Sequence, residues 1–183
     1  MITPSDTFLD EMESGMQEDM VFATCEMVAN RHISLILQED VHGRVNFWQR
    51  SDGQSPLYTH VKMSGFRVTA TSIDAADHVR NARETVLVPV ETPLLSSSQS
   101  LYSLDHGFHV HTFGNLTRGC QYTGPHYNPS NSTHGSPLDE RRHVGDLGNI
   151  RCDANGEIDS EMAYPRVSLI GDHSIIGRSL VVS

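Results

Sequence analysis

The sequence is poor in basic residues and has no long hydrophobic run. Its 183 residues contain no stretch of about 18 apolar residues, so no membrane-spanning helix is expected. The 13 Lys and Arg residues are outnumbered by 23 Asp and Glu residues, and the net charge of −10 disfavours binding to nucleic acid or to an anionic membrane. A small anionic substrate would need a local basic patch on such a protein.

The first 20 residues lack the features of a secretory signal peptide. They have neither a basic start nor an apolar stretch, and their acidic residues and methionines predict a loose, disordered tail over 1–20. We therefore expect a soluble, cytoplasmic protein from the sequence as it stands, and an extracellular protein if the N-terminus is incomplete. The remaining residues, 21–183, predict one domain.

Cysteine is also scarce. The three cysteines, Cys25, Cys120 and Cys152, form no CxxC pair, which excludes a zinc ribbon. Because their number is odd, at least one thiol has no partner among them.

Short apolar segments separated by turn residues dominate the chain. β-Branched and aromatic residues gather at 32–38 and 43–50, alternate with polar residues at 56–66, and return at 166–183. No helical stripe occurs before residue 70. This pattern predicts an all-β fold, either a sandwich or a Greek-key barrel.

Residues 67–105 interrupt the strand pattern. They combine a short helical segment expected at 72–84 with a proline-interrupted apolar run and a serine cluster. A loop of this length is uncommon inside a compact β-domain, so we interpret 67–105 as an insertion. We expect it to be poorly ordered and dispensable, because none of the candidate ligands below lies in it.

Histidine, in contrast, is concentrated in one region. Six of the 11 histidines lie between residues 106 and 146, and His109 and His111 stand two apart in an expected strand. Side chains alternate along a strand, so these two imidazoles should lie on the same face. The spacing alone leaves two interpretations open, a metal site and a chance pair on a solvated face.

Four further candidate ligands follow in a loop rich in glycine and proline: His126, His134, His143 and Asp146. Three histidines and one aspartate suit a tetrahedral zinc ion. The pair on the strand adds the imidazoles that a copper site requires. Six such residues within 38 positions, flanked by turn formers, argue against a merely solvated histidine-rich loop.

The motifs GFHVHTFGN, TGPHYNP, DERRHVGDLGNI and SLIGDHSIIGRSLVV resemble those of the copper/zinc superoxide dismutases, and most closely the extracellular type. The resemblance is close over 106–183 and looser over 23–66. It implies an eight-stranded Greek-key β-barrel that here carries an internal insertion, lacks its last strand and has a truncated C-terminus. It also implies an oxidoreductase that converts superoxide to dioxygen and hydrogen peroxide.

The resemblance assigns roles to individual residues. His109 and His111 correspond to copper ligands, and His126 corresponds to the catalytic imidazolate that bridges copper and zinc. The zinc site would be completed by His134, His143 and Asp146. Cys120 corresponds to a disulfide cysteine whose partner is absent here, since neither Cys25 nor Cys152 stands at the partner's position.

One departure from the family pattern concerns copper. Ser183 stands where the family has its fourth copper ligand, and a hydroxyl is a poor copper ligand beside imidazole. We therefore expect firm zinc binding, weak copper binding and little dismutase activity of residues 1–183, together with a weakened homodimer. The alternative is a non-catalytic zinc-binding protein on the same fold. A zinc hydrolase is excluded, because four protein ligands leave zinc no open position.

Overall fold

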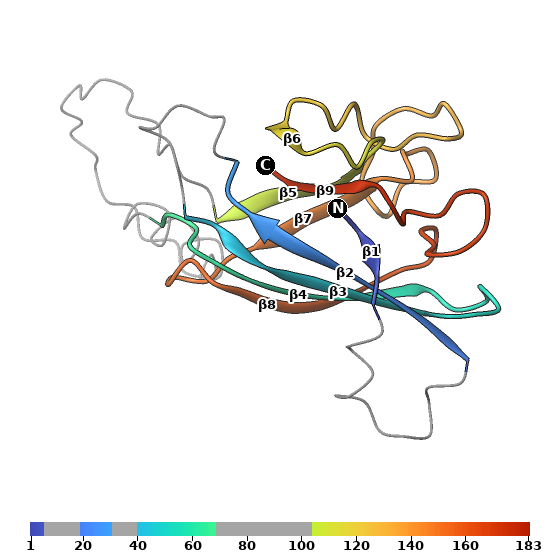
Figure 1. The fold of residues 1–183 in the computed structure, drawn as a ribbon, viewed down its shortest axis with the longest axis horizontal. Helices are drawn as coiled ribbons and strands as arrows, with labels where there is room; N and C mark the ends of the chain where they lie inside the picture. Colours follow the sequence, from blue (N-terminus) through green and yellow to red (C-terminus); the bar gives the residue numbers. More distant parts are fainter. Residues whose placement is uncertain (6–18, 31–39, 69–103) are drawn as a thin grey trace, which may run out of the picture.

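The computed structural model describes four parts of the chain: residues 1–5, 19–30, 40–68 and 104–183. These residues form nine β-strands and no helix, which confirms the predicted all-β class (Figure 1). Accordingly, no helix capable of crossing a bilayer is found among them. Three predictions concern residues outside this part: the strand at 32–38, the helix at 72–84 and most of the insertion at 67–105.

The larger sheet is antiparallel and has the strand order β1-β2-β3-β4-β8. Its strands are β1 (Thr3–Pro4), β2 (Met20–Val28), β3 (His42–Arg50), β4 (Leu57–Ser64) and β8 (Ile158–Tyr164). Along β3 and β4, buried residues alternate with exposed ones, so that Val45 and Val61 face inward while Arg44 and Lys62 face solvent. This alternation is what a sheet with one buried face requires.

The smaller sheet has the order β7-β5-β9 and is also antiparallel. Its strands are β5 (Asp105–His111), β7 (Asp146–Arg151) and β9 (Ser179–Val182), while β6 (Thr117–Cys120) belongs to neither sheet. Phe108 and Val110 of β5 are fully buried, whereas His109 and His111 are partly exposed. The apolar side chains of the central strand, β5, therefore pack in the core, and its histidine side chains lie on the opposite face of the sheet.

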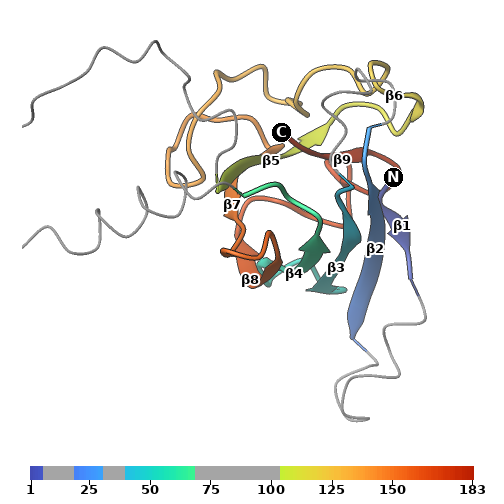
Figure 2. The same cartoon turned by 90° about the vertical axis from the view of Figure 1, so that its left-hand side faces the viewer.

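The hydrophobic core lies between the two sheets, which Figures 1 and 2 show stacked one above the other. Phe47 and Val61 from the larger sheet and Phe108 from the smaller one are completely buried there, together with Ile175 from the loop before β9. No strand ladder joins the two sheets within the described part of the chain, so the observed architecture is a β-sandwich.

The structure differs from the sequence prediction in the C-terminal region. Of the β-rich segment 166–183, only β9 forms a strand. Gly171 and Gly177 have φ angles of 76° and 79°, which turn the backbone out of an extended path. The segment 168–178 is closed instead by local hydrogen bonds, such as the one from the N–H of Ile175 to the carbonyl of Ser168 at 2.9 Å.

Both ends of the predicted tail 1–20 are part of the fold. Ile2 is fully buried, β1 pairs with β2, and Met20 is the first residue of β2. Two backbone hydrogen bonds of 2.8 Å join Ile2 to Gly177 and Arg178, and burial of its side chain adds to them. Most of the acidic residues of the tail fall within 6–18, outside the described residues.

Candidate metal centre

The candidate ligands come from the smaller sheet and from the long connection between β6 and β7. His109 and His111 lie on β5, and Asp146 is the first residue of β7, where it pairs with His109 across the ladder. His126 forms an isolated bridge with His111. The sheet thus fixes the backbone at the strand-borne residues, and the loop must bring the other histidines to them.

Backbone hydrogen bonds attach this loop to β5. The N–H of Tyr127 donates to the carbonyl of Val110 at 2.8 Å, and the N–H of Val110 donates to the carbonyl of Gly145 at 2.9 Å. Gly145 in turn donates to the carbonyl of Tyr127 at 2.9 Å. A Cβ at Gly145 would lie only 2.2 Å from the carbonyl oxygen of Val110, so only glycine permits this approach. The residues next to His126 and Asp146 are thereby held against the sheet.

Three imidazoles converge on the carboxylate of Asp146, whose side chain is only 1% exposed. The Nδ1 atoms of His126, His134 and His143 lie 2.8, 3.0 and 3.2 Å from Asp146 Oδ1. The second carboxylate oxygen, Oδ2, accepts hydrogen bonds from the backbone N–H groups of Gly135 and His143 at 3.1 and 3.0 Å. One oxygen is therefore held by backbone and the other faces the histidines.

This arrangement fits a zinc ion. The four ligand atoms, one from each of His126, His134, His143 and Asp146, all lie within 4.8 Å of one another. Bond lengths of about 2.0–2.2 Å to zinc imply separations of roughly 3.3–3.6 Å between tetrahedral ligand atoms. Imidazole nitrogen and carboxylate oxygen are also among the ligands that zinc prefers. The donor set could thus hold the ion after only small shifts.

The electrostatic environment keeps Asp146 ionised. Burial acts to raise the pKa of this carboxyl group, but hydrogen bonds from His126 and from the backbone of Gly135 and His143 outweigh burial and lower the pKa to about 2. The group therefore carries its negative charge at neutral pH, as a metal ligand must.

A second group of imidazoles, those of His109 and His111, also contacts His126. The ring of His109 stacks on that of His126 with centroids 4.1 Å apart, and the ring of His111 lies 5.1 Å away. Because Nδ1 of His126 faces Asp146, its Nε2 remains for a second ion. Burial, with a contribution from His126, lowers the pKa of His109 to about 4, and burial also lowers the pKa of His111. Both rings are therefore neutral near pH 7, the form that binds metals.

Ser183 lies beside this second group. The position of a Cβ on Gly107 would be 2.8 Å from Cε1 of His109 and 2.9 Å from Oγ of Ser183, so both side chains border the same space. Backbone hydrogen bonds of 2.7 and 3.0 Å between Gly107 and Ser183 extend the pairing of β5 and β9 to this point. A hydroxyl group thus borders His109 on this side.

All three cysteines are free thiols. Cys120 is exposed, whereas Cys25 and Cys152 are buried, and no disulfide joins any two of them. The disulfide that the resemblance implied for Cys120 is therefore not formed within these residues.

Sequence reasoning missed two arginines that stabilise the loop. Buried Arg142 donates from Nη1 to the carbonyls of His143 and Asp146 at 3.1 and 3.0 Å. The guanidinium of Arg178 lies 3.5 Å from the ring centroid of Tyr127, where a cation–π interaction holds it. Arg142 binds backbone carbonyls, and Arg178 binds a ring that is distant in sequence. The spacing of sequence motifs reveals neither kind of partner.

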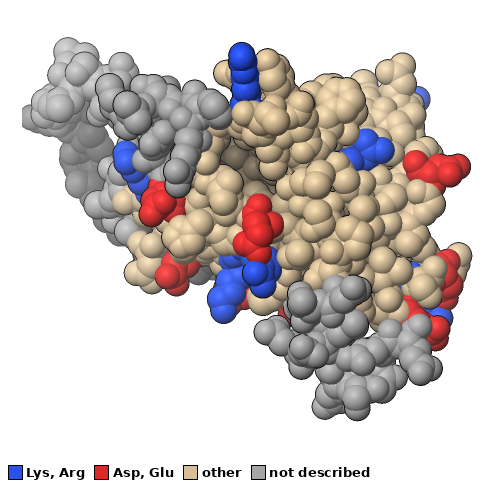
Figure 3. All heavy atoms as spheres, viewed as in Figure 1, with Lys and Arg blue, Asp and Glu red and all other residues tan. Residues whose placement is uncertain are grey.

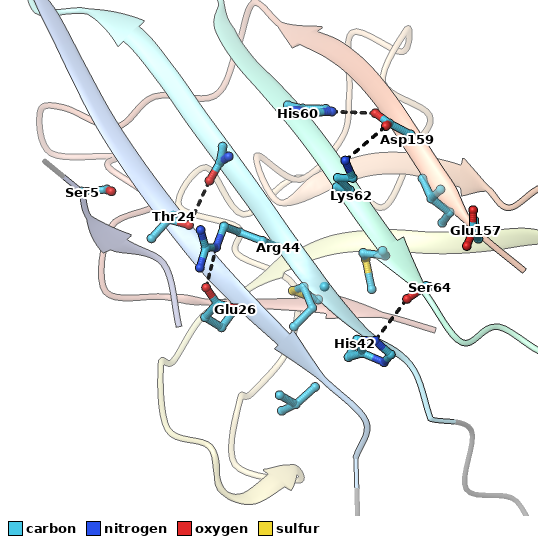
Figure 4. A pocket seen from close by; sticks show the side chains of 16 residues that line it. Ser5, Thr24, Glu26, His42, Arg44, His60, Lys62, Ser64, Glu157 and Asp159 are labelled. Carbon is cyan, nitrogen blue, oxygen red and sulfur yellow. Dashed lines mark hydrogen bonds and ion pairs between the residues drawn. The ribbon is translucent and has the colours of Figure 1, made fainter. Parts of the chain in front are cut away.

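A separate hollow, lined by none of the candidate metal ligands, lies on the outer face of the five-stranded sheet (Figure 4). Its volume is about 870 Å³, and several of the charged side chains that line it lie close to a partner of opposite charge or to an imidazole. Arg44 is bonded to Glu26, and His60 lies 2.7 Å from Asp159. These pairs join neighbouring strands, and among the described residues only His126, His134, His143 and Asp146 form a converging set of ligand atoms.

Comparison with known proteins gives one family. The family model described as "Copper/zinc superoxide dismutase (SODC)" matches residues 88–183, more than half of the chain. This match begins within the segment 67–105 that the sequence predicted to be an insertion.

Individual relatives agree with this family match. The extracellular superoxide dismutase (Cu-Zn) of Brugia pahangi is 58% identical over 77 residues, which are 42% of this chain and 39% of the relative. The superoxide dismutases (Cu-Zn) of Cordyceps militaris and Candida glabrata are 53% and 54% identical over 78 residues, which are 43% of this chain and 51% of each relative. The matched part of the chain thus spans about half or less of the length of these curated relatives.

Proposed function

The chain belongs to the copper/zinc superoxide dismutase family, and from this premise we propose that the whole protein converts superoxide to dioxygen and hydrogen peroxide. Copper and zinc are the cofactors of this family. The observation that carries the proposal is the position of His126, between the Asp146 cluster and the two histidines of β5.

We assign the residues to the two metals as follows. Zinc is bound by His126, His134, His143 and Asp146, and this assignment is supported by the convergence of their ligand atoms. Copper is bound by His109, His111 and His126, and this assignment is supported by the ring contacts of His126 with both strand histidines.

The residues of this chain would serve the reaction by holding and moving protons. Copper, when bound, supplies the one-electron acceptor and donor that the two half-reactions need. Two superoxide ions and two protons give one dioxygen and one hydrogen peroxide. Nε2 of His126 is the atom that can hold one of these protons, because Nδ1 is committed to the side of Asp146. His126 is therefore the proposed catalytic residue.

The charge distribution gives little help in attracting an anionic substrate. On the face shown in Figure 3, the basic and acidic side chains of the described residues are intermixed, and no continuous basic patch is visible. With a net charge of −10, capture of superoxide must depend on local groups at the metal centre. We therefore propose that residues 1–183 bind zinc firmly, bind copper weakly beside Ser183, and have low activity.

The alternative of a non-catalytic zinc-binding protein is not favoured. The relatives reported above are all named superoxide dismutases. In addition, the rings of His109 and His111 contact His126, and a protein that binds only zinc would not need these two imidazoles as ligands.

A homodimer is the proposed assembly. Phe113, Leu116 and Tyr122 lie close to β6 in the sequence, and these residues are 55%, 43% and 45% exposed. Large apolar side chains gathered at a surface are typical of a contact between proteins. Sedimentation analysis should show self-association that Phe113→Ser weakens, and a chain that is monomeric at all concentrations would contradict this assembly.

The direct test is metal analysis combined with activity. The chain loaded with zinc and copper should inhibit the reduction of cytochrome c by superoxide weakly but measurably. The substitution His126→Ala should abolish this inhibition and weaken the binding of both metals. His173→Ala is a matched control, because His173 is exposed and belongs to neither group of imidazoles. Equal activity of the His126→Ala variant and the unchanged chain would overturn the proposal.

A further inference from the structure

A buried hydroxyl group lies next to one of the strand histidines. Thr123 is fully buried although its side chain is polar. Its Oγ1 lies 2.8 Å from the carbonyl oxygen of Cys120 and 3.0 Å from Nδ1 of His111. The same Nδ1 lies 2.7 Å from the carbonyl oxygen of Gly124. These three contacts determine where the hydrogens are.

A carbonyl oxygen can only accept a hydrogen bond, which fixes the direction of each contact. The hydroxyl of Thr123 must donate to Cys120, and Nδ1 of His111 must carry the hydrogen that it donates to Gly124. The oxygen of Thr123 is then an acceptor for the same Nδ1–H, so this hydrogen is shared between two oxygens. In the neutral ring Nε2 consequently has no hydrogen and has its lone pair available.

We propose that Thr123 is a positioning residue for the metal site, which acts on copper through His111. This inference rests on the proposed function, because it requires His111 to bind copper. With two acceptors on one N–H, the ring is restricted in its rotation and held in the tautomer that presents Nε2. Acceptors for the second nitrogen also increase the electron density of the ligating one.

Thr123 also joins His111 to the turn that contains Cys120. The N–H of Thr123 approaches the carbonyl of Cys120 at 3.4 Å, and its hydroxyl reaches the same oxygen, so the residue closes the turn 120–123 by two contacts. The His111 ring is thereby oriented by a segment outside both sheets. The ordering of this turn and the geometry of the ligand should therefore change together.

Two substitutions of Thr123 separate the hydroxyl from the methyl group. Thr123→Val keeps the shape and removes the hydroxyl, whereas Thr123→Ser keeps the hydroxyl and removes the methyl group. Thr59→Val is the matched control, because Thr59 is also fully buried and its hydroxyl donates to the carbonyl of Met162 at 3.4 Å on the other sheet. All three variants lose part of a buried threonine, but only Thr123→Val removes an acceptor from His111.

Copper(II) affinity, measured by competition with a chelator, should fall about 10–100-fold in Thr123→Val, as for other partners of ligating histidines. The electron paramagnetic resonance spectrum of the copper-loaded chain should change in the same variant. Zinc affinity should remain unchanged, and Thr123→Ser and Thr59→Val should bind copper like the unchanged chain. In the metal-free chain, nitrogen chemical shifts should show His111 protonated at Nδ1. Because the carbonyl of Gly124 still accepts this hydrogen at 2.7 Å, Thr123→Val should weaken the preference for this tautomer without abolishing it.

Several results would overturn the inference. One is an unaltered copper affinity and spectrum in Thr123→Val. Another is a loss of copper affinity in Thr123→Ser or in Thr59→Val that is as large as the loss in Thr123→Val. Failure of the proposed function has a different signature, which is copper binding by His111→Ala as tight as by the unchanged chain. The tautomer measurement in the metal-free chain needs no copper and decides separately whether Thr123 controls the His111 ring.

Discussion

Gly145→Ala should detach the ligand loop from β5. The added Cβ would lie 2.2 Å from the carbonyl oxygen of Val110 and 2.9 Å from the backbone nitrogen of Tyr127, whereas ordinary contacts begin near 3.4 Å. The loop must therefore move by more than about 1 Å, which weakens the three backbone hydrogen bonds that join Gly145, Tyr127 and Val110. At about 0.5–1.5 kcal/mol for each bond, the loss in the free energy of unfolding is about 2–4 kcal/mol.

The assay is urea denaturation of the zinc-loaded chain, together with zinc analysis after dialysis. Gly171→Ala is the control, because a Cβ there meets no atom within 4 Å and only the φ of 76° is unfavourable. We expect the control to lose about 1–2 kcal/mol and to keep its zinc. If Gly145→Ala retains zinc and loses no more stability than the control, the reasoning from close approach is refuted.

Three other changes test the metal centre. Asp146→Ala should abolish stoichiometric zinc binding, because it removes the oxygen on which three histidines converge. Asp139→Ala, in the exposed part of the same loop, should keep the zinc. Equal zinc content of the two variants by atomic absorption would contradict this prediction. Ser183→His should raise copper(II) affinity in a chelator competition by adding an imidazole beside His109, and an unchanged affinity would argue against that position as a ligand site. Removal of zinc by a chelator should lower the melting temperature in calorimetry, with recovery when zinc returns, because binding energy at such sites stabilises the fold; identical melting curves would exclude a structural ion.

The sequence was sufficient to predict features that follow from local periodicity. The shared face of His109 and His111 followed from the alternation of side chains along a strand, and the alternation predicted over 56–66 is found in β4. These predictions succeeded because the period of a strand depends only on the backbone and not on distant partners.

Features that depend on distant partners were not predictable in this way. Ile2 is a single apolar residue with no periodic neighbours, and its burial depends on Gly177 and Arg178 at the other end of the chain. The hydrogen bonds of Arg142 and Thr123 are local in sequence, but they were not predictable either, because they go to backbone carbonyls, which every residue possesses, and the residue type does not reveal the partner. The convergence of the histidine nitrogens on Asp146 likewise depends on the path of the loop. The spacing of the sequence motifs fixes only the two ends of that loop.

Strand β5 has consequences for how this protein can change during evolution. Phe108 and Val110 fill the core from one side of the strand, and His109 and His111 occupy the other side, so neither face offers a position that is free to vary. Asp105, at the start of the strand, is bonded to Arg151 at 2.7 Å. A saturation mutagenesis experiment should therefore find β5 the least tolerant segment of the described chain. Adaptation of metal preference must then arise in exposed positions of the surrounding loops, such as Asp139, and not at positions such as Gly145 that hold the loop against the strand.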